Sequence, residues 1–248
     1  MSIKIINNDV CLNCKKETCA YIDVVTKNGT VFTSEGSVCP TGVLQSNPSL
    51  QANSPFAKKE CLNCGLCVGY CNKKNLQIDN LSSEINLEHC NSFGLNALVS
   101  NYLNRIFSFA ANSNRNSSIL FDAYVEFGSE KEAFVEVDEY DALECCRNLM
   151  GDFLLYEGQY TDEIDLGVIV LQEIPKKGSN VYTVIEKMHV FPNLEAKRIY
   201  FATFSLLRYL FLNHTHEVVD YETLFFNPIK ESVETYKKRI KTKYNFKV

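Results

Sequence analysis

Eight of the eleven cysteines stand at spacings that could hold a metal centre. The first group follows the pattern Cys-x2-Cys-x4-Cys with a later Cys-Pro, and the second follows Cys-x2-Cys-x2-Cys-x3-Cys. The two groups are Cys11, Cys14, Cys19 and Cys39, and then Cys61, Cys64, Cys67 and Cys71. Zinc sites prefer two separated Cys-x2-Cys pairs. A disulfide framework needs an oxidising compartment, for which the sequence gives no sign, so both of these alternatives have less support.

The second cysteine run has the spacing of bacterial two-cluster ferredoxins, with Asn72 in place of the usual proline. The tetrapeptide Cys-Leu-Asn-Cys at 11–14 returns at 61–64, and the segment 39–44 is similar to the one that carries a fourth ligand. Residues 1–80 therefore resemble that family, which implies two [4Fe–4S] clusters. By that resemblance the ligands are Cys11, Cys14, Cys19 and Cys71 for one cluster, and Cys61, Cys64, Cys67 and Cys39 for the other. A single cluster, or a mixed zinc–iron arrangement, is the alternative.

The chain departs from the ferredoxin pattern between Cys19 and Cys39, which are 20 positions apart. Strand-forming residues flank Asn28-Gly29, and Asn-Gly is the strongest short hairpin signal. We therefore expect an inserted hairpin over 21–37.

A second group of residues, three carboxylates, could bind a different metal. Asp122 and Glu136 stand on two neighbouring predicted strands, and Asp138 points to the same face as Glu136 because it lies two positions further on. Oxygen-rich sites suit Mg²⁺ or Mn²⁺. Such ions activate water and stabilise the charge that develops during phosphodiester cleavage. The alternative is that these are ordinary solvated carboxylates of an acidic hairpin.

The elements predicted for the second part of the chain are a series of helices and strands that follow a short linker. Apolar residues at spacings of three and four predict helices, and strand formers bounded by turn residues predict strands. The predicted order is helix 87–109, polar loop 111–118, strands 119–127 and 133–138, helix 141–156, strands 164–172 and 181–190, and helix 194–212. This order indicates an α/β or α+β domain around a mixed sheet.

The hairpin 121–138, the helix after it and the strand 165–170 resemble the PD-(D/E)xK nucleases, in particular type II restriction endonucleases. The resemblance implies that Asp122 and Glu136 are metal ligands and that a glutamate such as Glu88 joins them. It also implies a homodimer, because restriction enzymes usually act as dimers.

Two residues depart from the nuclease pattern. Phe121 stands where the family often has proline, and Asp138 stands where its catalytic lysine is expected. Some members of the family have an acidic or amide residue at the lysine position. Asp138 would then ligate the metal or act as a base, or else the site would be inactive.

The charge of the chain limits how it could bind nucleic acid. The formal net charge is −5, and two clusters with their thiolates would add roughly −4. Contact with phosphates must therefore use a local basic patch, unless the basic residues form only a solvated terminal helix. The basic residues near the C-terminal end are Lys230, Lys237, Lys238, Arg239, Lys241, Lys243 and Lys247.

We expect neither a signal peptide nor a membrane-spanning segment in this chain. Its most apolar stretch, 199–212, is interrupted by Arg208 and is too short to cross a bilayer. We therefore expect a cytoplasmic protein without membrane contact, in a compartment where thiols stay reduced.

Taken together, these patterns predict an α+β chain with two domains. A small ferredoxin-like iron–sulfur domain at 1–80 is followed by a mixed-sheet α/β restriction-endonuclease-like domain at 85–248. The first functional hypothesis is an iron–sulfur-containing, Mg²⁺- or Mn²⁺-dependent DNA endonuclease of the restriction or defence type. The second is a ferredoxin-type electron-transfer protein with a domain that docks a protein redox partner. The third is a catalytically silent nuclease-like subunit of a nucleic-acid-processing complex.

Overall fold

The computed structural model describes most of the second part of the chain and portions of the first. The described residues are 3–7, 40, 61–71, 73–78, 85–88, 90, 92–107, 111–113, 121–127, 131–160, 164–214 and 220–247. The hairpin predicted over 21–37 lies outside them, and so do Cys11, Cys14, Cys19 and Cys39.

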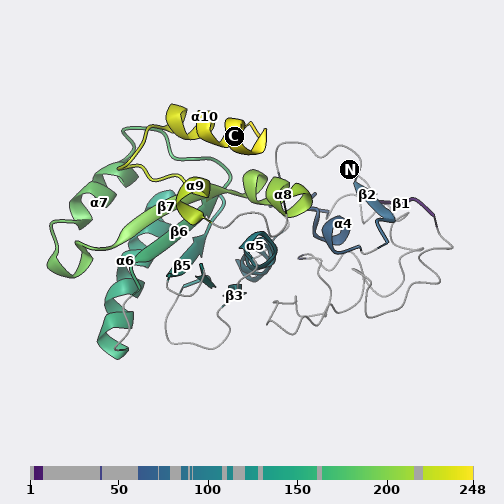
Figure 1. Cartoon of the computed structure of the whole chain (residues 1–248). Helices are drawn as coiled ribbons and strands as arrows, with labels where there is room; N and C mark the ends of the chain where they lie inside the picture. Colours follow the sequence, from purple (N-terminus) through teal and green to yellow (C-terminus); the bar gives the residue numbers. More distant parts are fainter. Residues whose placement is uncertain are drawn as a thin grey trace.

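The main sheet has five strands in the order β3-β4-β5-β6-β7. Strands β3, β4 and β5 pair antiparallel, whereas β5, β6 and β7 pair parallel. The mixed sheet predicted from the sequence is therefore confirmed (Figure 1). The strands are β3 (Ala111–Ser113), β4 (Ala123–Glu126), β5 (Glu132–Val137), β6 (Leu166–Leu171) and β7 (Arg198–Thr203).

Helices cover both faces of the sheet. Strand β6 is buried along its whole length, as expected for an apolar strand between two layers. Helix α6 (Ala142–Gln159) packs on β5 and β6 together with α7 (Asn180–Met188), while α5 (Ser92–Phe107) and α8 (Phe204–Asn213) pack together on the other side (Figure 1). Gly167 lets α6 approach β6 closely, because a Cβ atom there would lie 2.8 Å from Leu149 Cδ1.

Three sequence predictions about elements are wrong. The region 181–190, predicted as a strand, is helix α7, whose buried residues Val181, Ile185 and Met188 follow helical spacing. The region 194–212, predicted as one helix, contains strand β7 and then helix α8. The change falls at Thr203, whose side chain accepts the backbone N–H of Leu206 and caps α8. Strand β3 lies within the stretch 111–118, which had been predicted as a loop.

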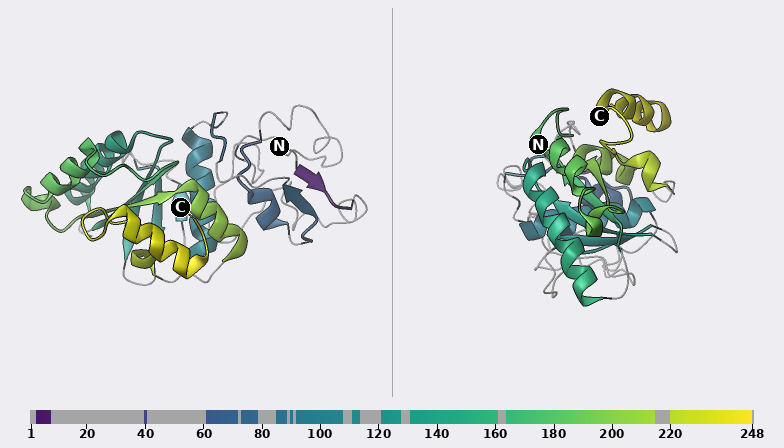
Figure 2. Two further views of the ribbon diagram at one scale, coloured as in Figure 1. Left: turned by 90° about the horizontal axis from the view of Figure 1, so that it is seen from above. Right: turned by 90° about the vertical axis from the view of Figure 1, so that its left-hand side faces the viewer.

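The described cysteine segment lies at one end of the molecule. Strands β1 (Ile3–Ile5) and β2 (Leu76–Ile78) form a separate antiparallel pair, and helix α4 (Leu66–Tyr70) precedes β2. Helices α5 and α8 lie between this segment and the five-stranded sheet (Figures 1 and 2). Leu62 and Leu66 belong to the same buried apolar cluster as the residues of α5 and α8, so the cysteine segment shares its core with the larger part of the chain.

The C-terminal part adds two helices on the outside of the sheet layers. Helix α9 (Tyr221–Leu224) and helix α10 (Val233–Tyr244) follow α8, and a short 3-10 turn, η2 (Pro192–Leu194), precedes β7. Within the ranges given above, every helix is too short or too polar to cross a bilayer.

Gly69 provides a test of the packing between the cysteine segment and α8. A Cβ atom at Gly69 would overlap the ring of Phe211, which Tyr70 and Tyr102 hold at centroid distances of 5.4 and 5.3 Å. We expect Gly69→Ala to lower the free energy of unfolding by about 2 kcal/mol, as overpacking of a filled core does. Chemical denaturation measures this change.

The matched control is Gly151→Ala in α6, where a Cβ atom would meet nothing within 4 Å. An alanine inside a helix is expected to keep or raise stability, by up to about 1 kcal/mol. If both variants were as stable as the wild type, the close packing of α4 on α8 would be refuted.

Candidate metal centres

Asp122 and Glu136 lie side by side where the hairpin β4–β5 begins and ends. Ala123 pairs with Val135 in the antiparallel register, which places Asp122 opposite Glu136. The backbone N–H of Asp122 contacts Glu136 Oε1 at 3.3 Å, and Asp122 Oδ2 accepts the N–H of Val137 at 2.8 Å. The strands therefore hold both carboxylates at one sheet edge, as the sequence predicted.

An amide from each of two helices holds this carboxylate pair. Asn96 of α5 donates to Asp122 Oδ1 at 2.8 Å, and Asn148 of α6 donates to Glu136 Oε2 at 3.3 Å. The two helices approach from opposite faces of the sheet. A neutral amide orients a carboxylate without cancelling its charge, so the negative charge of the pair is available to a cation.

The Glu136 carboxyl is almost completely buried, with 3% of the residue exposed. Burial raises the pKa of Glu136 to about 8, and the nearby charges of Asp122 and Asp152 raise it too, against the opposing hydrogen bonds from Asn148 and from the Asp122 N–H. Taking charge out of water and placing like charges together both favour the protonated form. A divalent cation would relieve both effects.

The pKa of Asp122 is also raised. Burial is the main cause, and the charge of Asp138 contributes, while hydrogen bonds from Val137 and Asn96 act in the opposite direction. Two adjacent carboxyls with raised pKa values are typical of functional sites.

Sequence reasoning missed Asp152, which lies on α6 four residues after Asn148. It is 2% exposed and close enough to Glu136 to raise the pKa of that residue. The sequence does contain a signal, because Asp152 falls on the same helical face as the buried Leu149 and Phe153. A charged residue on an apolar helical face indicates a functional or paired group, because such residues are rarely buried without a partner.

Asp138 and Glu88, which the sequence predicted as further metal ligands, do not take part in the described hydrogen bonds of the Asp122–Glu136 pair. Asp138 Oδ1 accepts the backbone N–H groups of Tyr140 and Asp141, both at 2.8 Å, so this oxygen shapes the turn before α6. Glu88 is exposed in the turn after Ile85. Among the described residues, the Glu88 side chain forms neither a hydrogen bond nor an ion pair with Asp122 or Glu136.

The described cysteine run forms a tightly curled loop that leads into α4. Asn63 and Gly65 have left-handed backbone conformations, with φ values of 60° and 78°, and they reverse the chain between successive cysteines. Cys64 and Cys67 are buried, and Cys71 Sγ accepts the backbone N–H of Asn75 at 3.3 Å. The described cysteines form no disulfide with one another. Thiols are the donors that an iron–sulfur cluster uses, but Cys61, Cys64, Cys67 and Cys71 are not grouped around one point among the described residues.

Two buried polar side chains donate hydrogen bonds to the backbone of the cysteine loop. The Tyr102 hydroxyl of α5 donates to the carbonyl oxygen of Cys64 at 2.5 Å, and Arg208 of α8 donates to the carbonyl oxygen of Asn63 at 3.0 Å. Burial lowers the pKa of Arg208, while the neighbouring Tyr102 and Cys64 raise it. The loop therefore has a buried guanidinium next to its thiols.

Within the described parts of the chain, three or more His, Cys, Asp or Glu side chains are nowhere grouped so as to enclose a metal ion. Asp122 and Glu136 form a pair, which is the number of carboxylates that Mg²⁺ sites commonly use together with water and substrate phosphates. The pair thus fits a magnesium or manganese ion that also contacts its substrate.

Comparisons of the chain with models of protein families, with curated proteins and with solved structures gave no match.

Proposed function

We propose that this protein is a metal-dependent nuclease of the restriction type that carries an iron–sulfur module. The adjacent pair of the half-buried Asp122 and the buried Glu136 is the observation on which the proposal rests. Neither carboxylate forms an ion pair with a described Lys or Arg, although both are held in place by amide and backbone N–H donors. A pair of adjacent, aligned carboxylates without a described basic partner is suited to a divalent cation.

The order of elements supports the same proposal. Strand β4 follows Asp122, β5 contains Glu136, and the next helix, α6, packs behind the sheet before the parallel strand β6. This is the arrangement that the resemblance to PD-(D/E)xK nucleases implies for an Asp on one strand and a Glu on the next.

In the proposed mechanism Asp122 and Glu136 hold the cation, and Asn96 and Asn148 orient the two carboxylates. A bound Mg²⁺ or Mn²⁺ would supply Lewis-acid activation of water and of the phosphate. The raised pKa values mean that the empty pair keeps a proton, which cation binding must release. Cation affinity should therefore rise with pH up to about 8, the pKa of Glu136.

Asp138 supports the site through the backbone in this proposal. Because its Oδ1 is engaged by the turn 138–141, it fixes the end of β5 and the start of α6, which carries Asn148. No described lysine contacts Asp122 or Glu136, so the proposal assigns no lysine to water activation.

Asp122→Asn is expected to lower cleavage at least about 10³-fold, because losing a metal ligand removes several kcal/mol of transition-state stabilisation. The assay uses anaerobically purified protein with loaded clusters, double- and single-stranded DNA, and Mg²⁺, Mn²⁺ or a chelator. Asp220→Asn is the matched control, because Asp220 is an exposed helix cap whose role an asparagine can keep.

The outcomes separate the hypotheses. Cleavage that needs the cation and is lost only in Asp122→Asn supports the nuclease. Equal cleavage by Asp122→Asn and wild type would refute the site. A wild type that binds DNA without cutting it would favour the silent subunit, and loaded, reversibly reducible clusters without any DNA binding would favour an electron carrier.

A further inference from the structure

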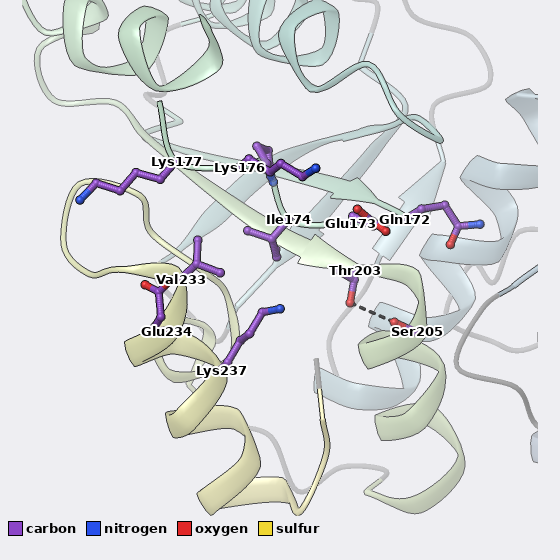
Figure 3. A pocket seen from close by; sticks show the side chains of 11 residues that line it. Gln172, Glu173, Ile174, Lys176, Lys177, Thr203, Ser205, Val233, Glu234 and Lys237 are labelled. Atoms are coloured by element: carbon purple, nitrogen blue, oxygen red, sulfur yellow. Dashed lines mark hydrogen bonds between the residues drawn. The ribbon is translucent and has the colours of Figure 1, made fainter. Parts of the chain in front are cut away.

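A cavity of about 530 Å³ lies beyond the carboxyl ends of β6 and β7 (Figure 3). The loop after β6 contributes Lys176 and Lys177, and α10 contributes Lys237 from the opposite side. Thr203 and Ser205, at the start of α8, contribute hydroxyl groups that lie 3.3 Å apart. Figure 3 shows the Lys237 side chain extending from α10 toward the end of β7.

The cavity has an excess of positive charge. Its lining includes three lysines against Glu173 and Glu234. Glu234 lies at the first turn of α10, where its own backbone N–H and the Ser232 side chain lower its pKa, with smaller contributions from Lys177 and Lys237. In the described part of the chain, none of the three lysines forms an ion pair within 4.0 Å. The ammonium groups of Lys176 and Lys237 are therefore available to an anionic ligand, whereas Figure 3 shows the Lys177 side chain extending away from Thr203 and Ser205.

The cavity and the carboxylate pair lie along the same edge of the sheet. Strands β5, β6 and β7 are parallel, so their carboxyl ends point the same way. The backbone joins the two places directly, because the N–H of Asp138 contacts the Val170 carbonyl at 3.2 Å and the N–H of Gln172, which lines the cavity, contacts the Glu139 carbonyl at 3.1 Å.

The distance between the cavity and the carboxylate pair fits a ligand that carries negative charges at regular intervals, such as a nucleic-acid strand. Glu136 pairs with Ile169 and Ile169 with Phe201, so Thr203 lies two strands across and two residues further along. Strand spacing of about 4.8 Å and a rise of about 3.4 Å per residue give roughly 12 Å between the Cα atoms of Glu136 and Thr203. A nucleic-acid strand, with one charge per about 3.4 Å of helix axis, covers that distance in a few nucleotides.

We infer that this cavity binds a backbone phosphate of the nucleic-acid strand whose reacting phosphate lies at Asp122 and Glu136. Lys176 and Lys237 supply the charge next to the phosphate, Lys177 adds positive charge at the rim of the cavity, and Thr203 and Ser205 supply hydroxyl groups that can donate hydrogen bonds to phosphate oxygens. The inference rests on the proposed function and names its substrate class. It also explains how a chain with a net charge of −5 can attract a polyanion at one place.

The test measures binding without cleavage. The full-length, cluster-loaded protein is titrated against fluorescently labelled single- and double-stranded oligonucleotides in the presence of a chelator, and the titrations are repeated at several salt concentrations. The variant is Lys176→Gln, Lys177→Gln and Lys237→Gln together. All three side chains are exposed, so the fold is expected to tolerate the change.

We expect this variant to bind at least about 10-fold more weakly, with a log K against log salt slope that is less steep by about 1, as the loss of one neutralised phosphate predicts. The control removes the same charge from exposed lysines that lie outside both the cavity and the basic C-terminal segment, by Lys73→Gln, Lys131→Gln and Lys187→Gln. It should change the affinity and the slope much less.

The outcomes distinguish this inference from the proposed function. If the two triple variants bind equally, or if the wild type binds no oligonucleotide, the phosphate cavity is refuted, even where cleavage is observed. If the lysines determine binding but the wild type does not cleave, the cavity stands and the nuclease assignment fails. A mononucleotide that binds the wild type through these lysines, while oligonucleotide binding does not depend on them, would identify a nucleotide pocket and overturn the inference.

Discussion

Replacing Glu136 by Gln is expected to abolish cleavage and, at pH 8 and above, to make the folded protein more stable than the wild type. The folded-state pKa of Glu136, about 8, lies above its ordinary value of 4.5. Between those values the folded state binds more protons than the unfolded state, so the stability of the wild type falls as the pH rises through this window. A glutamine can accept the same backbone hydrogen bond and has no charge to desolvate.

Chemical denaturation at pH 6, 7, 8 and 9 without divalent cations measures this effect. The difference in unfolding free energy between Glu136→Gln and wild type should grow with pH by roughly 1 to 3 kcal/mol and level off above pH 8. Saturating Mg²⁺ at pH 8 should stabilise the wild type by about 2.7 kcal/mol at 100 times the dissociation constant, and should leave Glu136→Gln unchanged.

The control for the pH series is Glu186→Gln, an exposed carboxylate on α7. It should follow the wild-type curve at every pH. If Glu136→Gln also ran parallel to the wild type, Glu136 would titrate normally, and the argument for a cation at this pair would lose its electrostatic basis.

Replacing Arg208 by Met is expected to lower the free energy of unfolding by about 2 to 3 kcal/mol, the usual loss when a charged group's buried hydrogen bond is removed. Arg208 is 4% exposed and donates to the Asn63 carbonyl inside the cysteine loop. If the loop holds an anionic cluster, the same change also removes a counter-charge. Iron per chain and visible absorbance should then fall.

Arg147→Met provides the comparison, because the Arg147 side chain is 62% exposed and, among the residues that the structure describes, pairs with Glu144 on the surface. Surface pairs of this kind contribute at most about 1 kcal/mol. Denaturation tests the role of Arg208 in the fold whether or not iron is present, whereas the iron content tests its role beside the cluster. Wild-type values of both in Arg208→Met would exclude both roles.

Much of the sheet could be predicted because its local signals agree with its tertiary environment. Strand β4 lies within the predicted 119–127, and β5 and β6 nearly coincide with the predicted strands. Their apolar and β-branched residues are bounded by turn formers, and the hairpin alone brings Asp122 opposite Glu136.

The errors come from segments whose structure depends on distant partners. Strand β7 exists because it pairs with β6 along its length, from Leu166 opposite Arg198 to Leu171 opposite Thr203. Its aromatic residues also fit a helical pattern when the segment is considered alone. Asn96 and Asn148 were missed for a related reason, since an asparagine inside a helix gives no local sign of the carboxylate that it will meet.

Helix α5 contacts both the carboxylate pair and the cysteine loop. Asn96 binds Asp122 near one end of the helix, and Tyr102, six residues further on, binds the cysteine loop at Cys64. Six residues span about 9 Å of helix. One continuous helix therefore connects the cysteine loop to the carboxylate pair, so a change in the position of α5 would alter the hydrogen bonds at both places, although Cys64 and Asp122 are far apart along the chain.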